Sequence, residues 1–194
     1  MKTRTLYKYV EVFGEDVLIN ALDKAREKQK PGNIIQVTNP IVRFLLTTTK
    51  TVNGKLTVIT NIRVNPNDLS YFTTVSSLLS DLKAEIFANE SYKNQIAEKI
   101  LATGQGPMLS ALNELFIAGY CKFLGLGIEL NSSKQKGAPD IKLKDLPFAI
   151  DAKLYPNNRL YLEDIVNSSA KEILAAVNKV QNQGLLISVF KPDK

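Results

Sequence analysis

The stretch GAPDIKLKDLPFAIDAKLY, from Gly137 to Tyr155, decides how the rest of this 194-residue chain is interpreted. Ile141 and Leu143 alternate with lysines, as the inward positions of a half-buried strand do. Residues 145–147 supply turn formers, and residues 148–150 begin a second apolar run. The pattern therefore predicts two short strands joined by a tight turn.

Three charged side chains are expected to meet on these strands. Asp151 and Lys153 are two residues apart, so in a strand they point to the same face. If the two strands pair, Asp140 approaches the same edge. Two carboxylates can seat a hard cation such as Mg²⁺, which polarises a phosphodiester and activates water, while an ammonium group stabilises the developing charge. Hydrolysis of a phosphodiester is the reaction that this set suits.

Pro139-Asp140 followed by Asp151-Ala152-Lys153 resembles the signature of the PD-(D/E)XK nuclease superfamily. The resemblance covers roughly the C-terminal half of the chain. It implies an α/β fold of the α+β type with a restriction-endonuclease-like core, as in Holliday-junction resolvases, in which helices flank a mixed sheet in the order α-β-β-β-α-β. The matching elements are expected at 107–124, 127–132, the two strands above, 168–183 and 185–190.

The resemblance also implies roles for individual residues. Asp140 and Asp151 would hold Mg²⁺, for which Mn²⁺ could substitute, and Lys153 would position the water and stabilise charge on the phosphate. Glu114, the acid on the first core helix, would be a further ligand. The alternatives are that Glu114 is an ordinary helix-surface carboxylate and that Glu129, on the next strand, is the further acid.

Lysines near this site are candidates for contacts with a nucleic-acid backbone. Lys134 and Lys136 belong to residues 131–137, which we expect to form a mobile loop beside the site. The resemblance adds Lys171, on the later helix. The two loop lysines could equally serve only to keep the loop soluble.

Composition limits the possible chemistry. The chain has no histidine, which excludes a histidine base, a Ser-His-Asp triad and the common Cys/His zinc sites, and the single cysteine, Cys121, cannot form an internal disulfide. A formal net charge of +6 favours a polyanionic partner such as DNA. No apolar window is long enough to cross a bilayer and the N-terminus lacks a signal-peptide pattern, so we expect a soluble, cytoplasmic protein without membrane contact.

Residues 1–105 are expected to form an N-terminal αβ extension packed on the core at 106–194. The pattern predicts a strand at 6–13, a helix at 15–30, a hairpin at about 41–64 around Asn53-Gly54, and helices within about 67–103. Lys50, Lys55 and Arg63 could make one face of the hairpin a phosphate-contacting surface, or that face could simply be solvated.

Together these features lead us to expect a Mg²⁺-dependent deoxyribonuclease of endonuclease type that works as a homodimer. A nucleic-acid-binding module of the same fold without chemistry is one alternative. A homomeric assembly protein, in which the aspartates and the lysine form a buried ion pair, is another.

Overall fold

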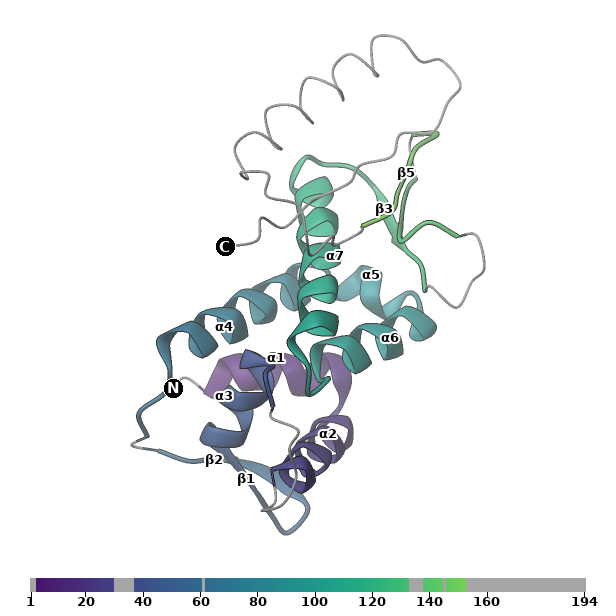
Figure 1. The fold of residues 1–194 in the computed structure, drawn as a ribbon. Coiled ribbons are helices and arrows are strands. Elements are labelled where there is room, and N and C mark those ends of the chain that lie inside the picture. The colour runs from purple at the N-terminus through teal and green to yellow at the C-terminus, as the bar shows by residue number, and fades with distance from the viewer. Residues whose placement is uncertain (1–2, 30–36, 61, 133–137, 145, 153–194) are drawn as a thin grey trace. The chain divides into compact units, whose positions relative to one another are not determined.

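The structure, a computed structural model, describes residues 3–29, 37–60, 62–132, 138–144 and 146–152 (Figure 1). These residues form a mixed α/β protein with seven helices and two small antiparallel sheets. The chain divides into two compact units, residues 1–112 and 113–194, and the division falls within the helix α7 (Gln105–Phe123). The helix predicted at 168–183 and the strand predicted at 185–190 lie outside the described residues.

The first unit is built mainly from helices. Phe72 stacks between Tyr9 and Phe44, with ring centroids 4.6 Å and 4.4 Å away, and all three side chains are buried. This aromatic stack joins α1, α3 and α4 into one core. The helices are α1 (Thr3–Phe13), α2 (Glu15–Lys28), α3 (Pro40–Thr48), α4 (Pro66–Asp81), α5 (Lys83–Phe87) and α6 (Glu90–Ile100).

The strand predicted at residues 6–13 is wrong, because this segment belongs to α1. Its apolar residues fit a strand by alternation, but four of them also recur at helical spacing and are buried: Leu6, Tyr9, Val12 and Phe13. The hydroxyl of Tyr9 donates to the backbone oxygen of Phe72 at 2.9 Å. Burial of one helical face against α4 decides between the two patterns.

The hairpin predicted at 41–64 is shorter than expected, because residues 41–48 belong to α3. The side chain of Asn39 accepts the backbone N–H groups of Ile41 and Val42, and Pro40 occupies the first turn, where its missing N–H costs nothing. Asn39 also donates to the backbone oxygens of Ile100 and Ala102, at 2.8 Å and 2.7 Å. A buried helix cap therefore sets the start of α3.

The turn of the hairpin is confirmed. Strand β1 (Thr49–Val52) pairs antiparallel with β2 (Lys55–Val58), and Asn53 and Gly54 between them both have positive φ, 51° and 73°. This geometry is that of a two-residue hairpin loop. The predicted helical region after it is also confirmed, as α4, α5 and α6.

The predicted helix at 107–124 is confirmed as α7, and only part of its circumference is buried among the described residues. One stripe is buried, formed by Met108, Ala111, Glu114, Leu115, Ala118 and Cys121. Another stripe is exposed, and in it Tyr120 and Phe123 expose 62% and 84% of their surface. Helix α7 thus has more apolar surface than it buries against the described residues.

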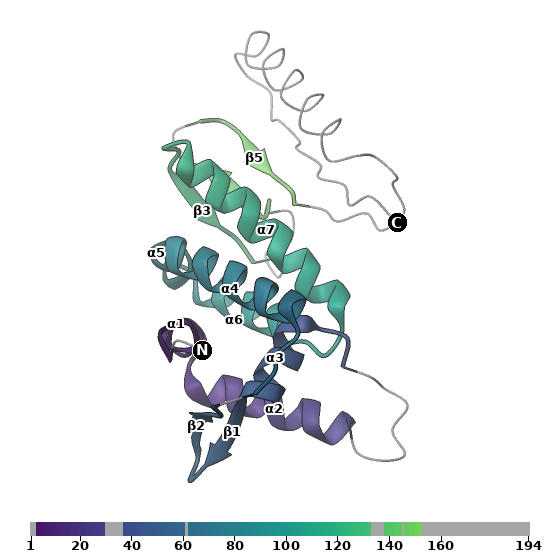
Figure 2. The same cartoon turned by 90° about the vertical axis from the view of Figure 1, so that its left-hand side faces the viewer.

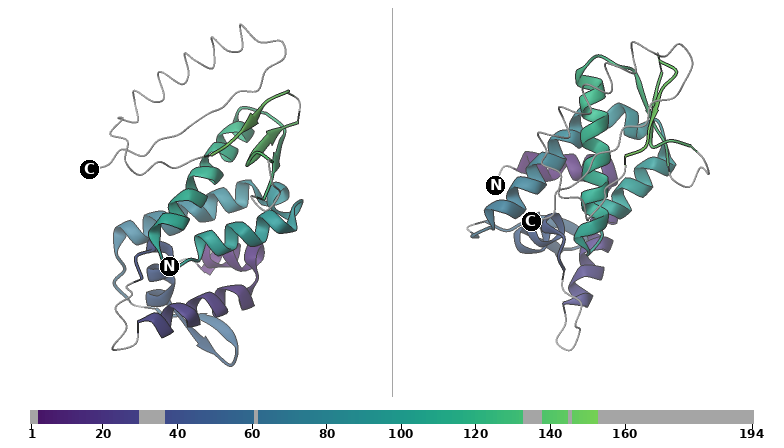
Figure 3. Two further views of the ribbon diagram at one scale, coloured as in Figure 1. Left: turned by 45° about the vertical axis from the view of Figure 1, so that its right-hand side comes forward. Right: turned by 45° about the horizontal axis from the view of Figure 1, so that its top comes forward.

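In the second unit α7 leads into a three-stranded antiparallel sheet (Figures 2 and 3). Gly125, with a φ of 78°, ends the helix: its N–H donates to Lys122 O, and the N–H of Leu126 donates to Cys121 O. Strands β3 (Ile128–Leu130), β4 (Ile141–Leu143) and β5 (Ala149–Ile150) follow in spatial order β3-β4-β5, which confirms the three predicted strands. One face of this meander is apolar and buried, formed by Ile128, Leu130, Ile141, Leu143 and Ile150.

Candidate active site

The register of the sheet brings the two predicted aspartates together. Ile141 pairs with Ile150 across β4 and β5, so continuing the register by one residue places Asp140 opposite Asp151. On the other side Leu130 pairs with Ile141, and the N–H of Asn131 donates to Asp140 O at 2.9 Å. Residues directly opposite in an antiparallel sheet point to the same face. Asn131, Asp140 and Asp151 therefore form one row across the end of the meander, which we name the aspartate row.

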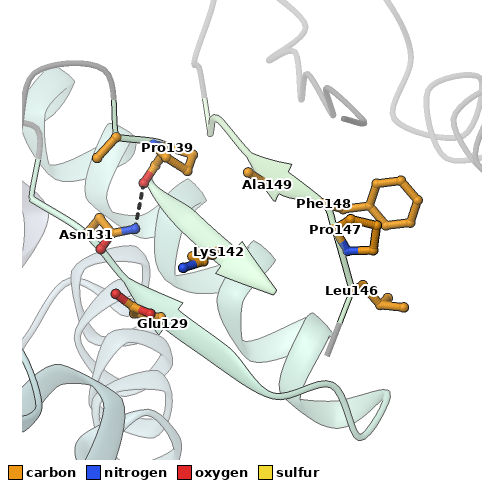
Figure 4. A pocket seen from close by; sticks show the side chains of 9 residues that line it. Glu129, Asn131, Pro139, Lys142, Leu146, Pro147, Phe148 and Ala149 are labelled. Carbon is orange, nitrogen blue, oxygen red and sulfur yellow. Dashed lines mark hydrogen bonds between the residues drawn. The ribbon is translucent and has the colours of Figure 1, made fainter. Parts of the chain in front are cut away.

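Backbone hydrogen bonds hold this row in place. The N–H of Ala152 donates to Asp140 Oδ2 at 2.8 Å, which fixes the carboxylate of Asp140 beside the backbone that carries Asp151. Asn131 Nδ2 donates to Pro139 O at 3.1 Å (Figure 4). Both aspartates are partly exposed, whereas only 6% of the surface of Asn131 is accessible. The Asp140 carboxylate is thus positioned by the sheet backbone, and both aspartates remain partly accessible to solvent.

A second row lies two residues along on the same face. Glu129 pairs with Lys142, and Lys142 pairs with Ala149 (Figure 4). Beside these residues is a hollow of about 560 Å³, whose lining is Glu129, Asn131, Ala138, Pro139, Lys142, Leu146, Pro147, Phe148 and Ala149. Asn131 belongs both to the lining and to the aspartate row. The hollow therefore adjoins the aspartate row at Asn131, and neither aspartate is part of its lining.

The further acid predicted for the site is not brought into a metal-ligating group with the aspartates. Glu114 lies on α7 with 1% of its surface exposed, so it is not the surface carboxylate of the alternative reading. Glu129 is exposed opposite Lys142. Throughout the described ranges, no three Asp, Glu, Cys or His side chains are grouped so that they could hold a metal ion. Asp140 and Asp151 are the predicted ligands that the register pairs.

Four of the predicted site residues fall in parts of the chain that the structure does not describe. Lys153, Lys134, Lys136 and Lys171 lie outside the described residues. The loop predicted at 131–137 begins differently from the expectation, since Asn131 and Ser132 are buried. Asn131 was missed as a site residue because its membership of the aspartate row depends on the β3–β4 register, and only its position after an apolar strand hinted at this.

The donor set of the aspartate row fits a hard divalent cation. Mg²⁺ is commonly held by one or two carboxylates, with waters and phosphate oxygens completing its shell. Two carboxylates directly opposite in a sheet repel each other, and a cation between them would offset that repulsion.

The thiol of Cys121 is a poor candidate for chemistry, because burial raises its pKa and favours the uncharged form.

Comparisons of the chain with protein-family models, with curated proteins and with solved structures found no match. In the described part of the chain, no helix is both long enough and apolar enough to cross a membrane.

Proposed function

We propose that residues 106–194 form the core of a metal-dependent nuclease of the PD-(D/E)XK type, which hydrolyses DNA phosphodiester bonds. The observation that carries the proposal is the register that sets Asp140 opposite Asp151 on the polar face of the meander. The order α7-β3-β4-β5 agrees with the first four elements of the core that the resemblance implies. Asp140 directly precedes the apolar strand residue Ile141, and Asp151 directly follows the apolar strand residue Ile150. Catalytic carboxylates at the end of a sheet would lie at such positions.

The two aspartates and Lys153 each have a definite task in this proposal. Asp140 and Asp151 would hold Mg²⁺ or Mn²⁺, and the hydrogen bond from Ala152 N–H keeps the Asp140 carboxylate oriented. A metal held there would supply Lewis acidity and would lower the pKa of a water bound to it. Lys153 is assigned from the sequence alone: on the face of Asp151 its ammonium would stabilise charge on the phosphate.

Cleavage assays test the proposal directly. Linear, nicked, branched and single-stranded DNA would be incubated with Mg²⁺, Mn²⁺ or EDTA and with wild type, Asp151→Asn or Lys153→Ala. We expect metal-dependent cutting that falls by about 10³-fold in Asp151→Asn, since a metal ligand supplies several kcal/mol of transition-state stabilisation. Glu98→Gln is the matched control, because Glu98 is an exposed acid on α6. Cutting by Asp151→Asn at the wild-type rate would contradict the assignment.

The further acid is tested separately. Glu114→Gln and Glu129→Gln would be compared for cutting and for the metal concentration that gives half-maximal rate. If Glu114 is the further ligand that the resemblance implies, Glu114→Gln should raise that concentration and Glu129→Gln should leave it unchanged. Circular dichroism checks that the buried substitution at Glu114 leaves the fold intact. The reverse result would assign the further ligand to Glu129.

A binding module without chemistry is the second candidate, favoured by the absence, among the described residues, of a group of three acidic side chains that could hold a metal ion. Such a module would bind DNA equally well in Mg²⁺ and in EDTA and would leave every substrate uncut. A native gel of the same reactions distinguishes the binding module from the nuclease.

The homodimer implied by the resemblance stays a prediction, which sedimentation of the full chain would test.

A further inference from the structure

The net positive charge of the chain arises in one segment. Residues 28–67 contain six lysine and arginine residues and no aspartate or glutamate. The rest of the chain carries acidic and basic residues in equal number, so this segment accounts for the whole formal net charge of +6. Its described part includes the β1–β2 hairpin of the first unit.

Helix α2 lies beside the hairpin (Figures 1 and 2) and forms a hydrogen bond with each of its two edges. At one edge Glu15 Oε1 accepts the N–H of Leu56 at 2.7 Å. At the other edge Arg26 Nη2 donates to Thr49 O at 3.5 Å. Thr49, Leu56 and Val58 share one face of the hairpin and are buried or partly buried. This face is the inner one, and the opposite face is directed to solvent.

The outer face of the hairpin consists of Lys50, Val52, Lys55 and Thr57, all of them exposed. Lys50 lies opposite Thr57, and Lys55 lies opposite Val52, so the two ammonium groups share one side of the ribbon. Neither ammonium group forms an ion pair or a hydrogen bond with the described residues. By contrast, Arg43 binds Asp68 and Lys83 binds Glu11. No acid lies on the outer face to neutralise it.

We infer that the β1–β2 hairpin is a docking element for duplex DNA, with its outer face in the major groove and Lys50 and Lys55 against phosphates. The major groove of B-form DNA admits a two-stranded ribbon. Each four-residue strand spans about 13 Å, comparable with the groove width of about 12 Å. Neutralising phosphates releases counterions, which drives binding. The inference gives the first unit a role of its own and does not depend on cleavage by the second.

Binding of the full chain to a fluorescein-labelled 20-bp duplex tests this inference, measured by anisotropy over a series of salt concentrations. EDTA and the Asp151→Asn background prevent cutting. We expect the double substitution Lys50→Gln and Lys55→Gln to raise Kd about tenfold and to reduce the slope of log K against log salt by about 2. The matched control removes the same charge elsewhere, at Lys83 and Lys93, whose ammonium groups already pair with glutamates.

Two results would overturn the inference. Wild-type affinity in the hairpin variant would show that Lys50 and Lys55 do not contact the DNA, and an equal loss in the control would show that net charge and not the hairpin governs binding. Equal affinity for an RNA duplex of the same sequence would remove the major-groove assignment, because that groove is too narrow in A-form RNA. Failure of the proposed nuclease looks different: DNA would remain uncut while the hairpin variant still lost binding.

Discussion

The hairpin β1–β2 and the meander β3–β4–β5 are both small antiparallel sheets with one polar face, yet they differ in charge and burial. The polar face of the hairpin carries lysines, and that of the meander carries the aspartate row. The inner face of the meander is fully buried, whereas Leu56 and Val58 behind the hairpin are only partly buried. The meander is thus part of a core, and its packing can hold polar side chains in defined positions. The hairpin is attached to the outside of a core and exposes charged side chains to solvent.

The largest expected effect is a difference between the two sheets in how much a truncated side chain lowers the free energy of unfolding. Ile141→Ala should lower the free energy of unfolding by about 2–5 kcal/mol, because it opens a cavity at a buried position of the meander. Leu56→Ala, in the hairpin, should cost about 1 kcal/mol, because Leu56 is already partly exposed. Urea unfolding followed by circular dichroism measures both. Equal losses would show that the hairpin is as much a core element as the meander.

A metal should stabilise the meander and not the hairpin. If the aspartate row holds Mg²⁺ or Mn²⁺, metal at about 100 times Kd should add about 2.7 kcal/mol to the unfolding free energy. Asp140→Asn should abolish this gain while keeping an oxygen that accepts the N–H of Ala152. Thermal unfolding with metal and with EDTA provides the measurement, and Lys50→Gln should retain the full gain. A gain that persists in Asp140→Asn would place the metal elsewhere.

The turn of the hairpin can be weakened alone. Gly54→Ala should cost about 1 kcal/mol, because a Cβ is disfavoured at a φ of 73°, although no atom lies within 4 Å of it. The loss should appear as faster hydrogen exchange at Val52 and Lys55, with exchange in the meander unchanged. Asn53→Gly is the control, since glycine accepts a φ of 51° without strain. Unchanged exchange in Gly54→Ala would mean that the turn does not limit opening of the hairpin.

The smallest effect concerns the dependence of stability on pH, and it is expected in the helical core of the first unit. Burial raises the pKa of Tyr9 well above its ordinary value of 10.0, so the folded first unit keeps this proton to higher pH than the unfolded chain does. The resulting stability is complete below pH 10 and is lost as the pH rises above it. Urea unfolding from pH 8 to 11 should show this loss in wild type and less of it in Tyr9→Phe.

Tyr9→Phe should also cost about 1 kcal/mol at pH 8, because the hydrogen bond to Phe72 O is removed. Tyr120→Phe is the control, since Tyr120 on α7 is exposed. It should keep the wild-type dependence on pH. A slope that vanishes in Tyr120→Phe instead would contradict the assignment to Tyr9.

The elements that the sequence predicted best are those with a single consistent signal. Asn53-Gly54 demands a hairpin turn, and the alternation at 141–150 fixes which residues of the meander face inward. Residues 6–13 and 41–48 were predicted as strands because short apolar runs fit both periods, and only tertiary packing and the cap at Asn39 select helix. The pairing of Asp140 with Asp151 could be anticipated from local sequence. The place of Asn131 could not, since it depends on a register set across a loop.

The two hydrogen bonds between α2 and the hairpin also limit how a partner can bind the hairpin. The N–H of Leu56 and the carbonyl of Thr49 are edge groups that an incoming peptide strand would need in order to extend a sheet, and Glu15 and Arg26 already occupy them. Recruitment by strand addition is therefore blocked at these positions, as is edge-to-edge association of two copies. A partner must meet the hairpin through its side chains, which makes recognition here sensitive to substitution and to salt.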